Sequence, residues 1–191
     1  MTPTANLTPP VWLQPLITAV AAATPEQLTR FLPPTSGGRP SAVLMLLGEG
    51  ADGPDLLITQ RAQAMRAHSG QPAFPGGAQD DTDADSAACA LREAQEEVGV
   101  DPAAVAVVAQ LPALWVPVTG FVVTPVLGWW HTPGPVAAQE AEVAAVHRVP
   151  IADLANPANR VRVRHPSGFI GPGFTVADMV VWGFTGGLVD G

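Results

Sequence analysis

The stretch REAQEEVGV (Arg92–Val100) concentrates carboxylates in a chain that carries few charges. Residues three and four apart share one face of a helix, so Glu93, Glu96 and Glu97 would face the same region of space. Each like-charge pair at this spacing costs a helix about 0.2–0.5 kcal/mol. Arg92, four residues before Glu96, offsets part of this repulsion. The Glu93–Glu97 pair is left without such a partner.

A divalent cation would turn this repulsion into ligation. Mg²⁺ is the natural candidate, because it takes hard oxygen ligands and is often held by one or two carboxylates together with substrate phosphates. A solvated acidic helix face is the competing interpretation of the same residues.

A calcium loop is a rival, because Asp81, Asp83 and Asp85 alternate just upstream. An EF-hand loop needs Gly at its sixth position and Glu at its twelfth. Counted from Asp81, those positions hold Ser86 and Arg92. The segment is therefore not an EF-hand loop.

The apolar pattern around this stretch predicts an α+β fold, a mixed sheet packed between helices. The acidic helix would begin among N-cap candidates in residues 80–86 and end at Gly99. Strands are expected at residues 41–48, 55–62, 105–112, 121–130, 141–150 and 160–165, the first two as an antiparallel hairpin. Further helices are expected at residues 11–22, 25–31 (with Thr24 as N-cap), 151–154 and 176–189, the last broken at its glycines.

The composition excludes several classes of function. The 191 residues fit one main domain, which we place at residues 41–191, after a helical, Pro-rich N-terminal arm at residues 1–40. The chain has no lysine and a net charge of −8, so its surface does not suit nucleic acid, which needs a basic patch.

The same reading predicts a protein of the cytoplasm. No apolar run reaches about 18 residues, so no membrane span is expected. No basic residue precedes the N-terminal apolar stretch, as a secretory signal would require. Cys89 is the only cysteine, so the chain can form no intrachain disulfide, and we interpret it as a packing residue.

Gly77, Asp83 and Arg92–Val100 together resemble the Nudix box, G-x5-E-x7-R-E-U-x-E-E-x-G-U, in which U is aliphatic. The C-terminal half matches throughout, with Ala94 in the first aliphatic slot. The N-terminal half departs in two ways. Asp83 stands where Glu is usual, and the spacing from Asp83 to Arg92 is one residue longer.

A second likeness lies just upstream. The segment LITQRAQAMRAHSGQPAFPGG (Leu57–Gly77) resembles the signature of the coenzyme A pyrophosphatase branch, L-L-T-x-R-[SA]-x3-R-x3-G-x3-F-P-G-G. The matching residues are Arg61, Ala62, Arg66, Gly70, Phe74, Pro75, Gly76 and Gly77. The two signatures adjoin in the right order and cover Leu57–Val100, whereas residues 1–40 carry no such likeness.

The resemblance implies a Nudix fold and a Mg²⁺-dependent hydrolase, with Mn²⁺ as an alternative metal. The implied reaction splits coenzyme A or its derivatives into 3′,5′-ADP and 4′-phosphopantetheine. ADP-ribose, a dinucleotide or another nucleoside diphosphate derivative stays open as substrate, and so does a non-catalytic nucleotide-binding module. The partner would be a small nucleotide, and a homodimer is left open.

The resemblance also implies roles for the acidic helix. Glu93 and Glu97 would bind Mg²⁺, with Glu96 as a third ligand, directly or through water. Arg92 would orient the glutamates. Glu97 could also act as the general base if it is not fully committed to metal.

Residues outside this helix receive provisional roles. Glu140 or Glu142, close to the start of the strand predicted at 141–150, could serve as the base, as late-loop glutamates do in some relatives. Gly76 and Gly77 would let the backbone approach the metal and the phosphates closely.

The arginines are the expected phosphate-binding residues, because a guanidinium grips phosphate oxygens bidentately. Arg61 and Arg66 would bind the substrate phosphates, with salt bridges to residues 80–85 as the alternative. His68 is more typical of a structural loop histidine than of a substrate contact. Arg160, Arg162 and Arg164 alternate along one strand, where they could meet a 3′-phosphate.

Overall fold

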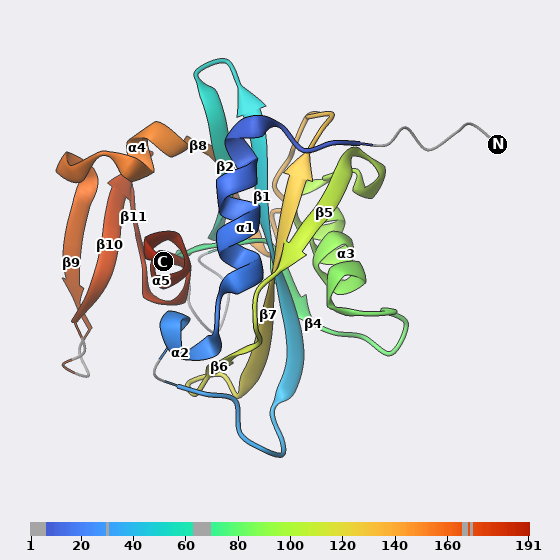
Figure 1. The fold of residues 1–191 in the computed structure, drawn as a ribbon, viewed down its shortest axis with the longest axis vertical. Helices are drawn as coiled ribbons and strands as arrows, with labels where there is room; N and C mark the ends of the chain where they lie inside the picture. The colour runs from blue at the N-terminus through green and yellow to red at the C-terminus, as the bar shows by residue number, and fades with distance from the viewer. Residues whose placement is uncertain (1–6, 30, 63–69, 166–167, 169) are drawn as a thin grey trace.

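The computed structural model describes residues 7–29, 31–62, 70–165, 168 and 170–191 (Figure 1). Within these residues the larger sheet contains eight strands, and its main path runs β3-β2-β1-β7-β5. β4 pairs with β1, β6 with β7 and β8 with β2. The strands are β1 (Arg39–Gly50), β2 (Gly53–Arg61), β3 (Pro72–Ala73), β4 (Gly76–Ala78), β5 (Val105–Gln110), β6 (Leu114–Val116), β7 (Phe121–Trp130) and β8 (Val143–Pro150).

Helices cover both faces of this sheet. Figure 1 shows α1 crossing one face and α3 lying beside β5 and β4. The helical elements are η1 (Val11–Leu13), α1 (Gln14–Ala22), α2 (Pro25–Leu28), α3 (Ser86–Val98), η2 (Pro102–Ala104), α4 (Ile151–Ala155), η3 (Pro157–Asn159) and α5 (Gly183–Asp190). In the described parts of the chain, no helix combines the length and the apolar character needed to cross a membrane.

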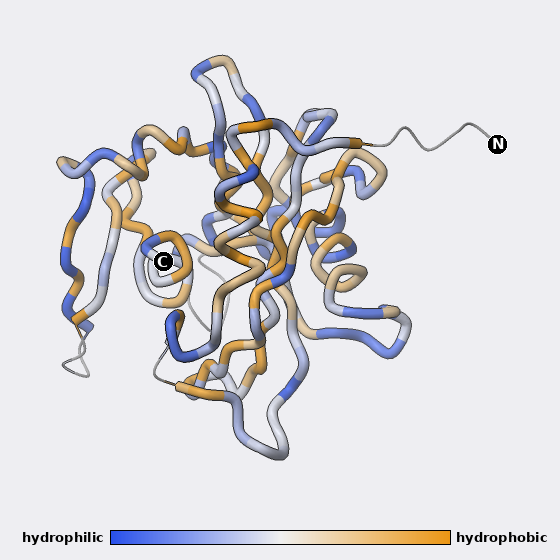
Figure 2. Tube along the Cα trace, in the orientation of Figure 1, coloured by the Kyte–Doolittle hydropathy of each residue, from blue (hydrophilic) through white to orange (hydrophobic). Residues whose placement is uncertain are grey.

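The central strand β1 explains why the sheet has two cores. Successive side chains of a strand point to opposite faces. Leu44 and Leu46 therefore pack with α3, whereas Met45 and Leu47 pack in a second cluster with residues of η1 and α1. Because both faces are covered, the middle of β1 is a continuous run of mostly buried apolar residues. Figure 2 shows hydrophobic residues gathered toward the middle of the fold.

Most of the predicted elements are confirmed. β1 and β2 form the antiparallel hairpin, with Leu47 opposite Leu56, and β1 runs parallel to β7, so the sheet is mixed. α3 begins where the Asp85 side chain accepts a hydrogen bond from the Ala88 N–H at 2.8 Å. It ends at Gly99, which has the left-handed φ of 73° that glycine adopts readily. The helix predicted at residues 25–31 is shorter and ends at Leu28.

The helix predicted at residues 176–189 is wrong over its first half. That segment belongs to a smaller antiparallel sheet of order β11-β10-β9, formed by β9 (Arg160–Arg164), β10 (Ile170–Val176) and β11 (Met179–Trp182). Ala177 and Asp178, both at positive φ, form the two-residue turn between β10 and β11. Neither turn residue is glycine, so the hairpin carries little turn signal in the sequence, and only α5 is helical.

The β10–β11 turn yields a stability prediction. The left-handed region costs an L-residue roughly 1–2 kcal/mol, whereas Asn-Gly suits a turn with two positive φ angles. The double substitution Ala177→Asn, Asp178→Gly should raise the free energy of unfolding by about 1 kcal/mol, measured by urea denaturation. The same exchange at Ala51 and Asp52, which do not have positive φ, is the control and should not stabilise the protein.

Candidate active site

Helix α3 lies close to the main sheet because its inward face carries small residues. Cys89, Ala90 and Ala94 are fully buried against the core. Glu97 lies near the C-terminal end of this face and is only 4 % exposed. The helix therefore brings one carboxylate into the protein interior, while Glu96 remains exposed.

Arg92 donates hydrogen bonds to three carboxylates and lies 3.8 Å from a fourth, that of Asp80. Its Nε and Nη2 donate to the two carboxylate oxygens of Asp83, both at 2.9 Å. Its Nη1 donates to Glu93 and to Glu96, also at 2.9 Å each. These hydrogen bonds lower the pKa of Asp83 to about 2 and raise that of Arg92. Asp83 thus contacts Arg92 bidentately in spite of its short side chain and the longer spacing.

Glu97 contacts β4 instead of Arg92. Its Oε2 accepts a hydrogen bond from the Gly76 N–H at 3.2 Å. Burial raises the pKa of Glu97 to about 7, although the Gly76 hydrogen bond and the charge of Arg61 both act to lower it. Burial likewise raises the pKa of Glu93. Among the described residues, the Gly76 hydrogen bond and the charge of Arg61 do not fully offset the effect of burial on the pKa of Glu97.

The two glycines of β4 permit this close approach. A Cβ added at Gly77 would lie 2.5 Å from Oε1 of Glu93. A Cβ at Gly76 would collide with the carbonyl oxygen of Ala42 and lie 2.7 Å from Cα of Val43. Backbone atoms cannot move aside as a flexible side chain does, so a larger residue at Gly76 would displace β4 from β1.

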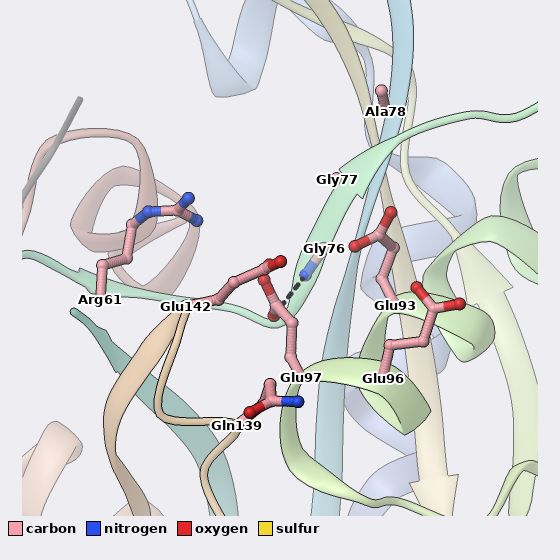
Figure 3. Close-up of a pocket in the computed structure, with 9 residues that line it drawn as sticks. All are labelled: Arg61, Gly76, Gly77, Ala78, Glu93, Glu96, Glu97, Gln139 and Glu142. Atoms are coloured by element: carbon pink, nitrogen blue, oxygen red, sulfur yellow. Dashed lines mark hydrogen bonds between the residues drawn. The ribbon is translucent and has the colours of Figure 1, made fainter. Parts of the chain in front are cut away.

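These side chains line a pocket of about 390 Å³ (Figure 3). In the view of Figure 3, Glu93 and Glu96 lie on one side of Glu97, and Arg61 and Glu142 lie on the other. Four carboxylates and one guanidinium therefore face the same space. The lining residues are Arg61, Gly76, Gly77, Ala78, Glu93, Glu96, Glu97, Gln139 and Glu142.

The structure brings most of the predicted site residues together. Glu142, but not Glu140, lines the pocket, and Arg92 contacts Glu93 and Glu96. Arg66 and His68 lie outside the described residues.

The arginines of β9 lie elsewhere. Arg160, Arg162 and Arg164 are exposed on the second sheet, which Figure 1 places on the opposite side of the molecule from α3. Arg160 pairs with Asp190, and its guanidinium lies 5.1 Å from the centre of the Phe174 ring. None of the three is among the residues that line the described pocket.

Two residues that line the pocket, Ala78 and Gln139, were not predicted from the sequence, and Gln139 is the polar one. Gln139 lies in the loop before β8, and no motif marks it. Its backbone N–H donates to the Glu97 carbonyl oxygen at 2.8 Å, which brings the loop against the end of α3. Only this tertiary contact places it beside the carboxylates.

The site could hold a hard divalent cation. Carboxylate oxygens are the ligands that Mg²⁺ and Mn²⁺ prefer, and a nearby positive charge would stabilise the ionised forms of buried Glu97 and partly buried Glu93. Across the residues described, no three metal-ligating side chains already stand in ligating geometry. In this structure Arg92 donates hydrogen bonds to Glu93 and Glu96, and the Gly76 N–H donates to Glu97. The donor set fits such an ion, because the carboxylates of Glu93, Glu96 and Glu97 line the same pocket.

Comparison with known proteins agrees with this geometry. A family profile described as NUDIX domain matches residues 38–167. The chain is 46 % identical over 143 residues to NudL of Cronobacter sakazakii, an uncharacterized Nudix hydrolase, which covers 71 % of this chain and 72 % of the relative. The NudL of Escherichia coli K12 is 43 % identical over 143 residues, which again cover 71 % of this chain and 72 % of the relative. The chain belongs to the Nudix hydrolase family, whose members generally use divalent metal ions.

Solved structures show the same fold at low sequence identity. The Nudix hydrolase RenU of M. smegmatis superposes with a TM-score of 0.53 at 22 % identity, over 63 % of this chain and 75 % of that one. A MutT/nudix family protein of Enterococcus faecalis gives a TM-score of 0.52 at 17 % identity, over 96 % of this chain and 73 % of the other. The predicted Nudix fold is confirmed.

The buried Glu97 carboxyl predicts a pH-dependent stability difference. The pKa of Glu97 is about 7 in the folded protein, above the ordinary value of 4.5, so the folded state binds the proton of this carboxyl more tightly than the unfolded state does. The resulting contribution to folding stability is fully present below pH 4.5 and is lost as the pH rises through 7. Without metal, Glu97→Gln should therefore gain stability over wild type between pH 5 and pH 8, by at most about 3 kcal/mol. Urea unfolding in EDTA measures this gain. If the stability difference between Glu97→Gln and wild type were the same at pH 5 and pH 8, the raised pKa of Glu97 would be contradicted.

Proposed function

We propose that this chain is a Mg²⁺-dependent diphosphatase that splits coenzyme A or its derivatives into 3′,5′-ADP and 4′-phosphopantetheine, with Mn²⁺ as an alternative metal. One observation carries the proposal. Arg61, Gly76 and Gly77 of the coenzyme A-type signature line the same pocket as the glutamates of α3. Two motifs that adjoin in sequence thus converge on one site.

The glutamates of α3 are the proposed metal ligands. Glu93 and Glu97 would hold the ion, with Glu96 as a third ligand, directly or through water. A bound ion would neutralise diphosphate charge and activate water for attack. Arg92 would act as a positioning residue, since it already contacts Glu93 and Glu96.

Two further side chains complete the proposed chemistry. Arg61 would bind a phosphate oxygen through its guanidinium, because it faces the pocket across from α3 (Figure 3). Glu142 would take the proton from the attacking water. It lines the pocket and is exposed, whereas Glu97 is buried and already accepts the Gly76 N–H.

The pocket chemistry also suits other diphosphates. ADP-ribose or a dinucleotide presents the same diphosphate to the same carboxylates, so these are the alternative substrates. A binding module without turnover is the remaining alternative. It is disfavoured because a pure nucleotide binder gains nothing from four carboxylates, which repel phosphate unless a cation is present.

A substrate panel tests the proposal. Coenzyme A should exceed dephospho-coenzyme A in kcat/KM by about tenfold or more, because the 3′-phosphate makes charge-assisted hydrogen bonds to arginine. Dephospho-coenzyme A lacks only that phosphate. Arg66→Ala and Arg162→Ala should be made separately. The substitution that abolishes the preference for coenzyme A over dephospho-coenzyme A identifies the arginine that binds the 3′-phosphate. Equal turnover of both substrates, with ADP-ribose preferred, would replace coenzyme A by the broader substrate class.

Gly77→Ala tests the metal assignment with a matched control. The added Cβ would displace the Glu93 carboxylate, so Mn²⁺ affinity, measured by calorimetry, and kcat/KM should each fall at least about tenfold. Gly134→Ala places a Cβ with no atom within 4 Å and should change neither. A folded Gly77→Ala protein with normal Mn²⁺ affinity would show that Glu93 is not a ligand.

A further inference from the structure

The turn before β8 fixes a pocket residue through backbone contacts alone. The Gln139 N–H donates to the Glu97 carbonyl at 2.8 Å, and the Gln139 carbonyl accepts the N–H groups of Glu142 and Val143 at 2.9 and 2.8 Å. The Glu142 carbonyl accepts the Ala62 N–H at 2.8 Å. These bonds tie the ends of α3 and β2 to the start of β8. The position of Gln139 therefore does not depend on its side chain.

The Gln139 side chain is available to a ligand. It is exposed and lines the pocket, and its carboxamide has no hydrogen-bond partner among the described residues. Figure 3 shows it beside Glu97, on the side away from Glu93 and Glu96. This part of the pocket is bordered by Glu142 as well.

The charge balance of the pocket gives this carboxamide a role. A diphosphate brings anionic oxygens toward four carboxylates. A cation held by α3 would meet those oxygens on one side only. On the other side, the lining side chains in the described part of the pocket offer two hydrogen-bond donors, Arg61 and Gln139. Glutamate in place of Gln139 would have the same shape, yet it would add a fifth carboxylate and no donor.

We propose that the Gln139 Nε2 donates a hydrogen bond to a non-bridging oxygen of the bound diphosphate, which makes Gln139 a substrate-binding residue. The inference rests on the proposed function to the extent that the ligand is a diphosphate. It requires neither coenzyme A as the particular substrate nor Glu142 as the base. An amide N–H that meets an anionic oxygen makes one of the stronger hydrogen bonds found in proteins.

Three variants test the assignment. Gln139→Ala removes the donor, Gln139→Glu replaces it by a like-shaped anion, and Gln110→Ala changes an exposed glutamine of β5 as the control. Binding is measured by calorimetry with Mg²⁺ and methylenediphosphonate, a diphosphate analogue that cannot be hydrolysed. Gln139→Ala should weaken binding about tenfold and Gln139→Glu further, whereas Gln110→Ala should match wild type. Mn²⁺ affinity without the analogue should stay unchanged in Gln139→Ala.

Steady-state kinetics separate this inference from the proposed function. On the best substrate of the panel, Gln139→Ala should raise KM about tenfold and leave kcat within about threefold. If wild type binds the analogue but hydrolyses no diphosphate, the proposed function fails, and weaker binding by Gln139→Ala still supports the inference. Unchanged analogue binding in a folded Gln139→Ala or Gln139→Glu protein overturns it. A wild type that binds no analogue, or a loss of kcat at constant affinity, overturns it as well.

Discussion

The burial of a carboxylate, Glu97, between α3 and the main sheet is the constraint on which the site depends. An ionised group in such a place is costly unless a donor or a positive charge faces it. Among the described residues, the Gly76 N–H lies within hydrogen-bond distance of the Glu97 carboxylate, and the pKa of Glu97 remains raised to about 7. The ionised Glu97 carboxylate is therefore unfavourable in the folded protein, and a cation bound beside it would stabilise it.

The neighbouring elements are shaped by this arrangement. β4 lies so close to β1 at Gly76 that an added Cβ would meet backbone atoms of Ala42 and Val43. At Gly77 an added Cβ would instead meet the Glu93 carboxylate of α3. Arg92, held bidentately by Asp83, keeps Glu93 and Glu96 near the same point without full burial. The carboxylates on the acidic face of α3 are therefore ordered by hydrogen bonds instead of pointing freely into solvent. Its carboxylates are restrained by hydrogen bonds that a cation can replace.

The pocket is completed by segments far apart in the chain. β2 delivers Arg61 and the turn before β8 delivers Glu142, because β2 and β8 pair antiparallel with Arg61 opposite Val143. The second sheet stands apart and takes the β9 arginines with it (Figure 1). A substrate that reached both places would have to extend well beyond the diphosphate.

The sequence by itself determined the acidic helix, its glycine end, the β1–β2 hairpin and the glycine pair, because each is encoded by local spacing or local backbone chemistry. Ala177 and Asp178 misled the prediction, since the β10–β11 hairpin places both at positive φ although neither is the glycine that usually marks such a turn. The separation of Glu142 from Glu140, and the presence of Gln139 in the pocket, were decided only in three dimensions. A loop side chain acquires its neighbours from backbone hydrogen bonds to distant elements, and no periodicity in the sequence records those bonds.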